Sequence, residues 1–372
     1  MTTRLRRPET PSGLVLSLMN TMESKKGSYM TVSLAVLGIA VLIYLFLTLP
    51  FGDVWEQFLG VNTVLIGEYI ASIIFIQLVL TWRWQAVLQS RGYDDVSFWS
   101  LNVYRLGGAA VSFLTPTAKM GGEPVRALIL NKDSDLDFDT SLSTVVIDKT
   151  IELTSSGLFF IIGLIAALIT YSLTASLRNT FLGIILFLTV LIGGFFIRVF
   201  NGKNFFAWLF SSMQLDRIER LSGVLEKIRE VEQLVVEFYE RDKKGLVYAV
   251  LISLMSWIGM FFEYYFVGQI VGVNLSLLQV FFVFTFVGLA YLVPVPMAVG
   301  TLEAGQVSLF SVIGLGSAKG LGVSLVVRAK DMLVSAVGIG CLVYSGVSLQ
   351  EAFSEADTSP DEVAEDVEEV VD

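Results

Sequence analysis

Six long apolar runs limit the fold of this chain more than any other feature of its sequence. About 20 apolar residues in a helix cross the roughly 30 Å hydrocarbon core of a bilayer. Hydrophobic residues fill 54% of the 372 positions and charged residues only 16%, as is typical of a membrane protein. We therefore expect an all-α, polytopic membrane protein with about six full spans, at Val32–Leu49, Thr63–Trp82, Ser141–Tyr171, Thr180–Phe200, Leu246–Val271 and Leu321–Tyr344.

The net charge of −10 comes from the acidic residues at the C-terminal end. Residues 351–372 hold ten Asp or Glu and no Lys or Arg, so the rest of the chain is neutral. Such a run predicts an acidic disordered tail over 348–372, with a docking tail for a basic partner as the alternative. We expect no nucleic-acid partner.

The sequence contains no histidine and a single cysteine, Cys341. The absence of histidine excludes His-dependent catalytic triads, His metal ligands and His general bases. A lone cysteine within an apolar segment predicts a packing role. We expect no metal and no cofactor, and any proton chemistry would fall to a carboxylate or a lysine.

Basic residues predict the orientation of the spans. A cytoplasmic N-terminal segment (1–30) and the flank Arg83 and Arg91 carry positive charge, whereas the loop between the first two spans is acidic. Residues 214–244 predict a cytoplasmic amphipathic helix, because apolar positions recur there at helical spacing beside charges of both signs. We expect a cell-membrane protein with a membrane domain over 31–347 and both termini cytoplasmic.

Two short stretches interrupt this pattern. Phe113–Arg126 contains two prolines, two adjacent glycines and three charged residues, and Pro294–Gly300 contains two prolines and a glycine. Proline and paired glycine interrupt helices, and at bilayer depth such backbone is tolerated only inside protein or beside a wet cavity. We expect a broken, re-entrant helix pair at each stretch.

The two interruptions share a spacing. Pro116 precedes Glu123 by seven residues, as Pro296 precedes Glu303. Charges then follow each glutamate at nearly equal distances: Asp148, Lys149 and Glu152 after the first, and Arg328 and Asp331 after the second. Halves of about 31–172 and 178–347, each with three crossings, would form an inverted repeat, a transporter architecture. Chance coincidence is the alternative.

The first break predicts an anion site. Pro124 suits the first turn of a short helix, whose free N–H groups would join Lys119 and Arg126 around a phosphate, with Gly121, Gly122 and Glu123 beside them. The alternative is a structural kink whose charges meet lipid phosphates. At the second break, beyond Pro296 and Gly300, Thr301 is expected to cap a helix with Glu303 in its first turn.

The charges within the late spans should face protein, because each would cost about 2.5–3.5 kcal/mol in lipid. Asp148, Lys149 and Glu152 share one helix surface, and Arg328 with Asp331 would form a mirror cluster. They predict either a polar substrate path or structural ion pairs. Glu68 and Glu263 are lone acids in spans, suited to coupling or to a hydrogen bond with a neighbouring helix.

The two breaks resemble signature segments of the lysylphosphatidylglycerol synthase transmembrane region family, which are flippase-like membrane proteins. The similar segments are Pro116–Ala127 (PTAKMGGEPVRA), the Asp148 and Lys149 pair, Pro294–Ala304 (PVPMAVGTLEA) and the helix with Arg328. The likeness extends over about residues 30–347. Asp148 and Lys149 stand where the family usually has Glu and Arg, and Leu302 stands where it often has arginine.

The resemblance implies movement of a phospholipid or polyprenyl-phosphate-linked head group between leaflets. In bacterial relatives this region is fused to a soluble aminoacyltransferase domain. We expect no such domain after residue 347 of this chain. A membrane-embedded enzyme acting on lipid-linked substrates, with Glu123 or Asp148 as base, and an ion-coupled solute carrier are the alternatives. We expect no enzyme, because no catalytic motif is present; a homo-oligomer stays open.

Overall fold

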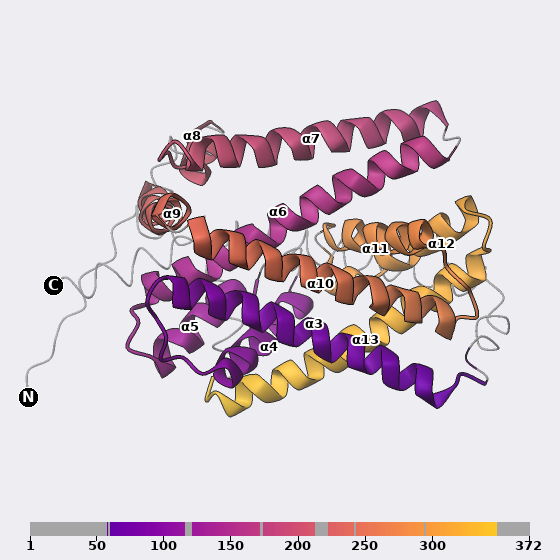
Figure 1. Ribbon diagram of the computed structural model, residues 1–372, viewed down its shortest axis with the longest axis horizontal. Helices are drawn as coiled ribbons and strands as arrows, with labels where there is room; N and C mark the ends of the chain where they lie inside the picture. Colours follow the sequence, from indigo (N-terminus) through magenta and orange to yellow (C-terminus); the bar gives the residue numbers. More distant parts are fainter. Residues whose placement is uncertain are drawn as a thin grey trace, which may run out of the picture.

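A computed structural model describes residue 58 and residues 60–115, 121–171, 174–212, 222–241, 243–293 and 295–347. These residues form helices and no strand, which confirms the expected all-α polytopic class (Figure 1). The predicted span Val32–Leu49, the N-terminal segment, Pro116, Lys119 and the acidic tail lie outside the described residues. The helices are α3 (Thr63–Ser90), α4 (Phe98–Leu114), α5 (Glu123–Asp133), α6 (Phe138–Thr170), α7 (Ala175–Val199), α8 (Phe206–Ser212), α9 (Ser222–Arg241), α10 (Lys243–Ile270), α11 (Leu277–Tyr291), the 3₁₀ turn η3 (Pro296–Ala298), α12 (Thr301–Val312) and α13 (Ser317–Tyr344).

Four of these helices, α3, α6, α7 and α10, are long and apolar enough to cross a membrane. Helix α13 is as long as α3, at 28 residues, but Arg328, Lys330 and Asp331 interrupt its apolar character. Helix α6 has 33 residues, or about 50 Å, and therefore extends beyond a 30 Å core. Its start is fixed by Asp137, which accepts a hydrogen bond from the Thr140 N–H at 3.1 Å; hydrogen bonding to Thr140 lowers the pKa of Asp137.

Large apolar side chains cover the outer surface of the long helices. A soluble monomer does not expose so much apolar surface, whereas lipid accepts it. Helix α7 shows this most clearly, because it lies at the edge of the bundle (Figure 1). The exposed side chains include Ile70 and Ile74 of α3, Leu158 and Ile162 of α6, Leu186, Phe187 and Val190 of α7, and Leu251, Leu254 and Ile258 of α10.

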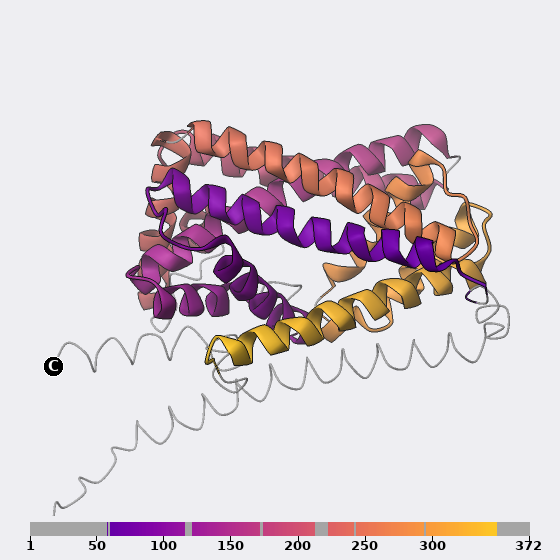
Figure 2. The same cartoon turned by 60° about the horizontal axis from the view of Figure 1, so that its bottom comes forward.

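The second half of the chain repeats the first in element order. Helices α3 and α10 each have 28 residues, and each is followed by a shorter helix, a break, an 11- or 12-residue helix and another long helix. Helices α3 and α10 pack together and run in opposite directions (Figure 1). Helices of the two halves also pack on one another elsewhere, because α4 packs on α13 (Figure 2) and α6 packs on α11. An inverted repeat would place corresponding helices in this way.

Both predicted breaks separate two helices. Helix α4 ends at Leu114 and α5 begins at Glu123. Helix α11 ends at Tyr291, and the backbone then passes through η3 before α12 begins. Met297 and Ala298 have positive φ angles of 54° and 51°, which is strained for residues other than glycine. The second break therefore needs support from its surroundings.

The predicted amphipathic helix is observed as α9, over Ser222–Arg241. Its apolar face, with Val235, Phe238 and Tyr239, packs in one core cluster with residues of α6 and α7. Glu232 of α9 is buried and accepts hydrogen bonds from the backbone N–H groups at the start of α8, including that of Ala207 at 2.9 Å. Burial raises the pKa of Glu232 in spite of these bonds.

Candidate functional site: a charged cavity between the two halves

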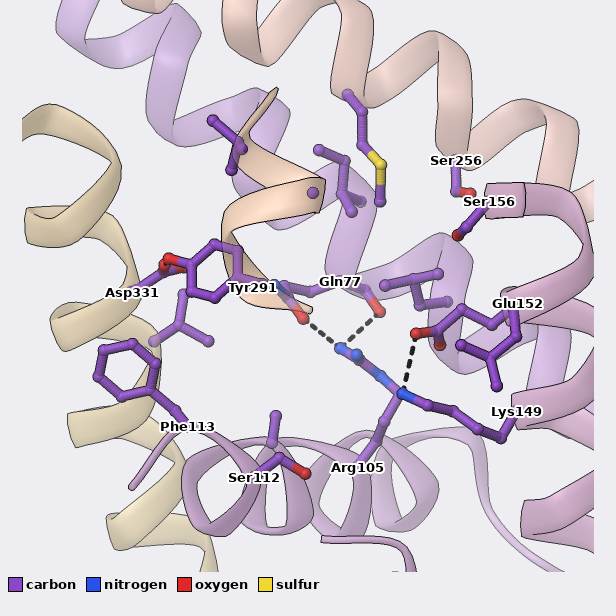
Figure 3. Close-up of a pocket in the computed structure, with 18 of the residues that line it drawn as sticks. Gln77, Arg105, Ser112, Phe113, Lys149, Glu152, Ser156, Ser256, Tyr291 and Asp331 are labelled. Atoms are coloured by element: carbon purple, nitrogen blue, oxygen red, sulfur yellow. Dashed lines mark hydrogen bonds and ion pairs between the residues drawn. The ribbon is translucent and has the colours of Figure 1, made fainter. Parts of the chain in front are cut away.

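A cavity of about 360 Å³ lies where helices of the two halves meet. Helices α3, α4, α6, α10, α11 and α13 contribute to its wall (Figure 3). Aromatic and aliphatic side chains such as Trp257, Phe284 and Val287 form part of this wall. Ten charged side chains also line it, and they fall into two groups.

The first cluster belongs to the N-terminal half and is centred on Asp148. The Asp148 side chain is 1% exposed and accepts from Arg83 Nε at 2.7 Å and from Arg126 Nη2 at 2.9 Å. Arg126 also lies over the ring of Trp84, 4.2 Å from its centroid. These contacts join α3, α5 and α6. We define the first cluster as Arg83, Arg105, Glu123, Arg126, Asp148, Lys149 and Glu152.

Lys149 and Glu152 extend this network toward the cavity (Figure 3). Lys149 Nζ lies 3.1 Å from Glu123 and 3.0 Å from Glu152, and Arg83 Nη2 lies 2.9 Å from Glu152. The structure thus brings together the three charges that the sequence places on one face of α6, and α5 supplies Glu123 beside them. A buried charge needs such partners to offset its desolvation.

Arg105 of α4 completes the first cluster with neutral partners. Its Nε donates to Thr81 Oγ1 at 3.0 Å, and its Nη2 donates to the Gln77 carbonyl at 3.1 Å and to Gln77 Oε1 (Figure 3). Arg105 is 8% exposed and lines the cavity. Among the described residues no carboxylate forms a salt bridge with it.

The second cluster, Glu263, Lys330 and Asp331, lies in the C-terminal half. Lys330 Nζ is 2.7 Å from Glu263 and 3.5 Å from Asp331, and the Tyr291 hydroxyl donates to Asp331. Glu263 of α10 therefore bonds to a neighbouring helix, α13. This was one of the two alternatives predicted for it, the other being a role in coupling. Glu68 was given the same two alternatives, but its side chain is exposed on α3 and forms no bond to a neighbouring helix among the described residues.

A further ion pair supports the strained second break. Arg328 Nε lies 2.7 Å from Glu303 Oε1, and Arg328 also donates to the carbonyls of Met297 at 3.0 Å and Ala298 at 3.4 Å. Glu303 Oε2 accepts from the Gly300 N–H at 2.9 Å. One ion pair thus holds both the positive-φ backbone and the start of α12.

This pair has a counterpart in the first half. Glu303 lies in the first turn of α12 and pairs with a cation 25 residues later, and Glu123 at the start of α5 pairs with Lys149, which is 26 residues later. The sequence spacing placed these charges at matching distances, but the expected mirror cluster of Arg328 with Asp331 is not formed by a bond between them, because Arg328 pairs with Glu303 and Asp331 lies beside Lys330. The prediction that Thr301 caps α12 was wrong, because Gly300 takes the cap position with φ 82° and Thr301 is the first helical residue.

The predicted site residues separate into two sets. Glu123, Arg126, Asp148, Lys149, Glu152 and Asp331 line the cavity. Gly121, Gly122, Pro296, Gly300, Glu303 and Arg328 are described but are not part of its lining. The first five lie at the breaks or at the start of the helix that follows, and the side chain of Arg328 in α13 contacts the second break.

The predicted phosphate site at the first break has internal partners. Arg126 pairs with Asp148, and the Gly122 N–H donates to Ser112 Oγ at 2.8 Å. Phosphate binding there stays a prediction, and it would require these bonds to open.

Sequence reasoning missed Arg83, Arg105 and Lys330 as site residues. Arg83 was expected in a cytoplasmic flank but is 2% exposed and bound to Asp148. Arg83 lies inside the 28-residue α3, and a longer expected span would have included it. Within the described residues no group of three or more Cys, Asp or Glu is arranged to hold a metal ion.

Replacing Glu303 with glutamine should weaken the second break. Arg328 would lose its ionic partner while keeping its two carbonyl acceptors, so we expect a loss of about 2 kcal/mol in the free energy of unfolding. Unfolding by SDS in mixed micelles measures this loss. Glu68→Gln, on the exposed face of α3, is the matched control and should leave stability unchanged. Equal stability of the two variants would show that the ion pair does not support the break.

Comparison with known proteins identifies the family. Residues 30–338 match the family described as lysylphosphatidylglycerol synthase TM region. A UPF0104 membrane protein of Methanothermobacter thermautotrophicus is 23% identical over 86% of this chain and 96% of its own length. A UPF0104 membrane protein of Pyrococcus horikoshii is 25% identical over 75% of this chain and 87% of its own. No solved structure matches the chain. This chain is a membrane protein that belongs to the lysylphosphatidylglycerol synthase transmembrane region family.

Proposed function

We propose that this protein moves the polar head group of a lipid between the leaflets of the cell membrane. The observation that carries the proposal is the cavity, which places ten charged side chains between long apolar helices. A charge inside a membrane protein is costly, and such residues commonly mark substrate or ion pathways. The cavity offers a polar head group an environment that lipid tails do not.

The size and lining of the cavity favour a head group over a whole lipid. Its volume of about 360 Å³ is at the lower end of small-molecule sites. The surrounding helices expose apolar side chains on their outer faces, so acyl chains would stay in the bilayer while the head group enters. Apolar wall residues such as Leu80 and Phe160 would admit the upper part of the tails.

The inverted halves supply a means of alternating access. Discontinuous helices that meet between two inverted repeats are a recurring transporter arrangement, in which one half rocks against the other. Each half has an ion pair beside its own break, Glu123 with Lys149 and Glu303 with Arg328. Because each pair joins helices of the same half, each half could move as a unit. Both breaks would be re-entrant, with both termini cytoplasmic. The sequence has no GxxxxGK[ST] loop, so transport would be passive or ion-coupled.

The enzyme alternative receives less support from the geometry. Asp148 accepts from two guanidinium groups, and Glu123 is paired with Lys149. Both carboxylates are thus held by cations of the protein itself, whereas a general base must be within hydrogen-bond reach of the proton that it removes from the substrate. Lipid profiling separates the alternatives, since loss of a covalently modified lipid on deletion of the gene would indicate an enzyme.

Leaflet exchange of fluorescent phospholipids and polyprenyl-phosphate lipids in liposomes tests the proposal. We expect wild-type protein to exchange at least one of these lipids faster than empty liposomes. Ala109→Trp, which fills the cavity from α4, should return exchange to the empty-liposome rate. Leu186→Trp, on the exposed face of α7, is the control and should exchange as wild type does. Exchange that is equal in wild-type and empty liposomes would refute the proposal, as would full exchange by Ala109→Trp.

A further inference from the structure

Arg105 differs from the other cations that line the cavity. The remaining lining cations each form a salt bridge with at least one carboxylate: Arg83, Arg126, Lys149 and Lys330. Arg105 forms none with any residue that the structure describes, although it shares the cavity wall with the carboxylates of the first cluster. The cavity therefore contains a guanidinium group without a counter-ion from the described part of the chain.

Neutral groups of α3 fix the direction of this guanidinium. Its Nε donates to Thr81 Oγ1 at 3.0 Å and its Nη2 donates to the Gln77 carbonyl at 3.1 Å, whereas its Nη1 donates to no acceptor among the described residues. Figure 3 shows the side chain extending from α4 into the cavity toward Gln77. Arg105 is more than nine-tenths buried. A buried cation without a counter-ion is unfavourable, so a bound anion would stabilise it.

The surroundings of Arg105 favour an anion with a single charge. A second negative charge would need a second cation, and the other lining cations would have to leave their carboxylates to supply it. The planar fork of a guanidinium matches the oxygens of a phosphate. A phosphodiester carries one charge and joins the head group to acyl chains, which would stay in the bilayer. A phosphomonoester or a diphosphate carries more than one charge.

We propose that Arg105 binds the phosphodiester of the lipid head group, and that the cavity therefore prefers phosphodiester lipids to phosphomonoester and diphosphate lipids. This inference rests on the proposed function and names its substrate class. It places phosphate recognition on α4, away from the first break. Arg126 keeps its bond to Asp148 in this arrangement, and the first cluster does not have to open.

Lipid binding tests this selection independently of transport. Purified protein is incubated with equal amounts of phosphatidylglycerol, phosphatidic acid and diacylglycerol with identical chains, and bound lipid is counted by native mass spectrometry. A phosphomonoester has a second pKa of about 6, so at about pH 8.5 phosphatidic acid carries nearly two negative charges. We expect phosphatidylglycerol to exceed diacylglycerol by about tenfold, the equivalent of one charge-assisted hydrogen bond, and also to exceed phosphatidic acid. Equal occupancy by phosphatidylglycerol and either of the other lipids would overturn the proposal.

Variants assign the preference to Arg105. Arg105→Gln removes the charge and should make the occupancies of phosphatidylglycerol and diacylglycerol equal, whereas Arg105→Lys keeps a cation and should retain a reduced preference. Arg229→Gln makes the same change at an exposed position of α9 and should bind as wild type does. Ala109→Trp, which fills the cavity, should also abolish the preference. A preference that persists in Arg105→Gln would overturn the proposal. If that variant fails to fold, a preference that persists in Ala109→Trp would do so, because the phosphate site would then lie outside the cavity.

Two further arms separate a lipid from a soluble anion, and binding from transport. Inorganic phosphate and glycerophosphoglycerol, at the same concentration as the lipid, should leave phosphatidylglycerol bound. Displacement by either would show that the ligand is a soluble phosphate and overturn the lipid assignment. Leaflet exchange is measured on the same preparation. An absence of exchange together with a retained preference for phosphatidylglycerol would refute the proposed transport while supporting phosphodiester binding at Arg105.

Discussion

Replacement of Asp148 by asparagine is expected to lower the free energy of unfolding by about 5 kcal/mol, the upper end of the range for breaking a buried ion pair. Asparagine has nearly the same shape but no charge, so the guanidinium groups of Arg83 and Arg126 would lose their shared partner. Both are almost fully buried, at 2% and 6% exposure. Arg83 would retain Glu152, whereas Arg126 would retain no carboxylate among the described residues.

Unfolding of the purified variant by SDS in mixed micelles measures this effect. Asp95→Asn is the matched control, because Asp95 is exposed between α3 and α4 and should tolerate the same change. A loss below about 1 kcal/mol for Asp148→Asn, as expected of an exposed pair, would show that this cluster is hydrated and structurally unimportant. The role of Asp148 as the centre of the first cluster would then be wrong.

Replacement of Gly122 by alanine is expected to cost about 3 kcal/mol through overpacking. Helices α4 and α5 approach each other so closely that an added Cβ would collide with the backbone carbonyl of Gly108. Backbone atoms cannot move aside as a flexible side chain can. The first break would have to open, and the contact between Arg126 and Asp148 would open with it.

Gly193→Ala is the control for this change. Gly193 lies inside α7 with no atom within 4 Å of the added Cβ, so alanine should stabilise the helix by about 0.5–1 kcal/mol. The two variants should therefore shift stability in opposite directions in the same unfolding assay. Similar behaviour of both would mean that α4 and α5 are not closely packed at the first break.

The long apolar runs and the repeated spacing of the two breaks made much of the fold predictable from the sequence. The apolar runs fixed the helical class, and the matched spacing from Pro116 to Glu123 and from Pro296 to Glu303 indicated two corresponding halves. The same spacing placed Arg328 25 residues after Glu303, and the two side chains form an ion pair. These features are local in sequence or repeat at a constant distance, so one chain is enough to detect them.

The missed residues depend on packing between distant helices. Arg105 and Gln77 are 28 positions apart, and Arg83 and Asp148 are 65 apart. Nothing in the spacing of one helix reveals such a neighbour. Arg83 was misplaced because the basic residues at the end of an apolar run usually mark the membrane surface, whereas α3 continues as a helix to Ser90 and carries Arg83 into the bundle.

The glycines at the first break illustrate a second limit. Gly122 was predicted as part of an anion site, but the structure explains the glycine by the close approach of Gly108. Sequence alone cannot separate these explanations, because both require the absence of a side chain. The distinction came from the position of a neighbouring helix.

The central claim is that a polar, water-accessible cavity lies between the two inverted halves. The most direct measurement is the reaction of an introduced cysteine with a membrane-impermeant thiol reagent, in a background with Cys341→Ala. Ser156→Cys, whose side chain points into the cavity (Figure 3), should react rapidly, while Leu186→Cys on the lipid-facing side of α7 should not. A Ser156→Cys variant as unreactive as Leu186→Cys would contradict the claim.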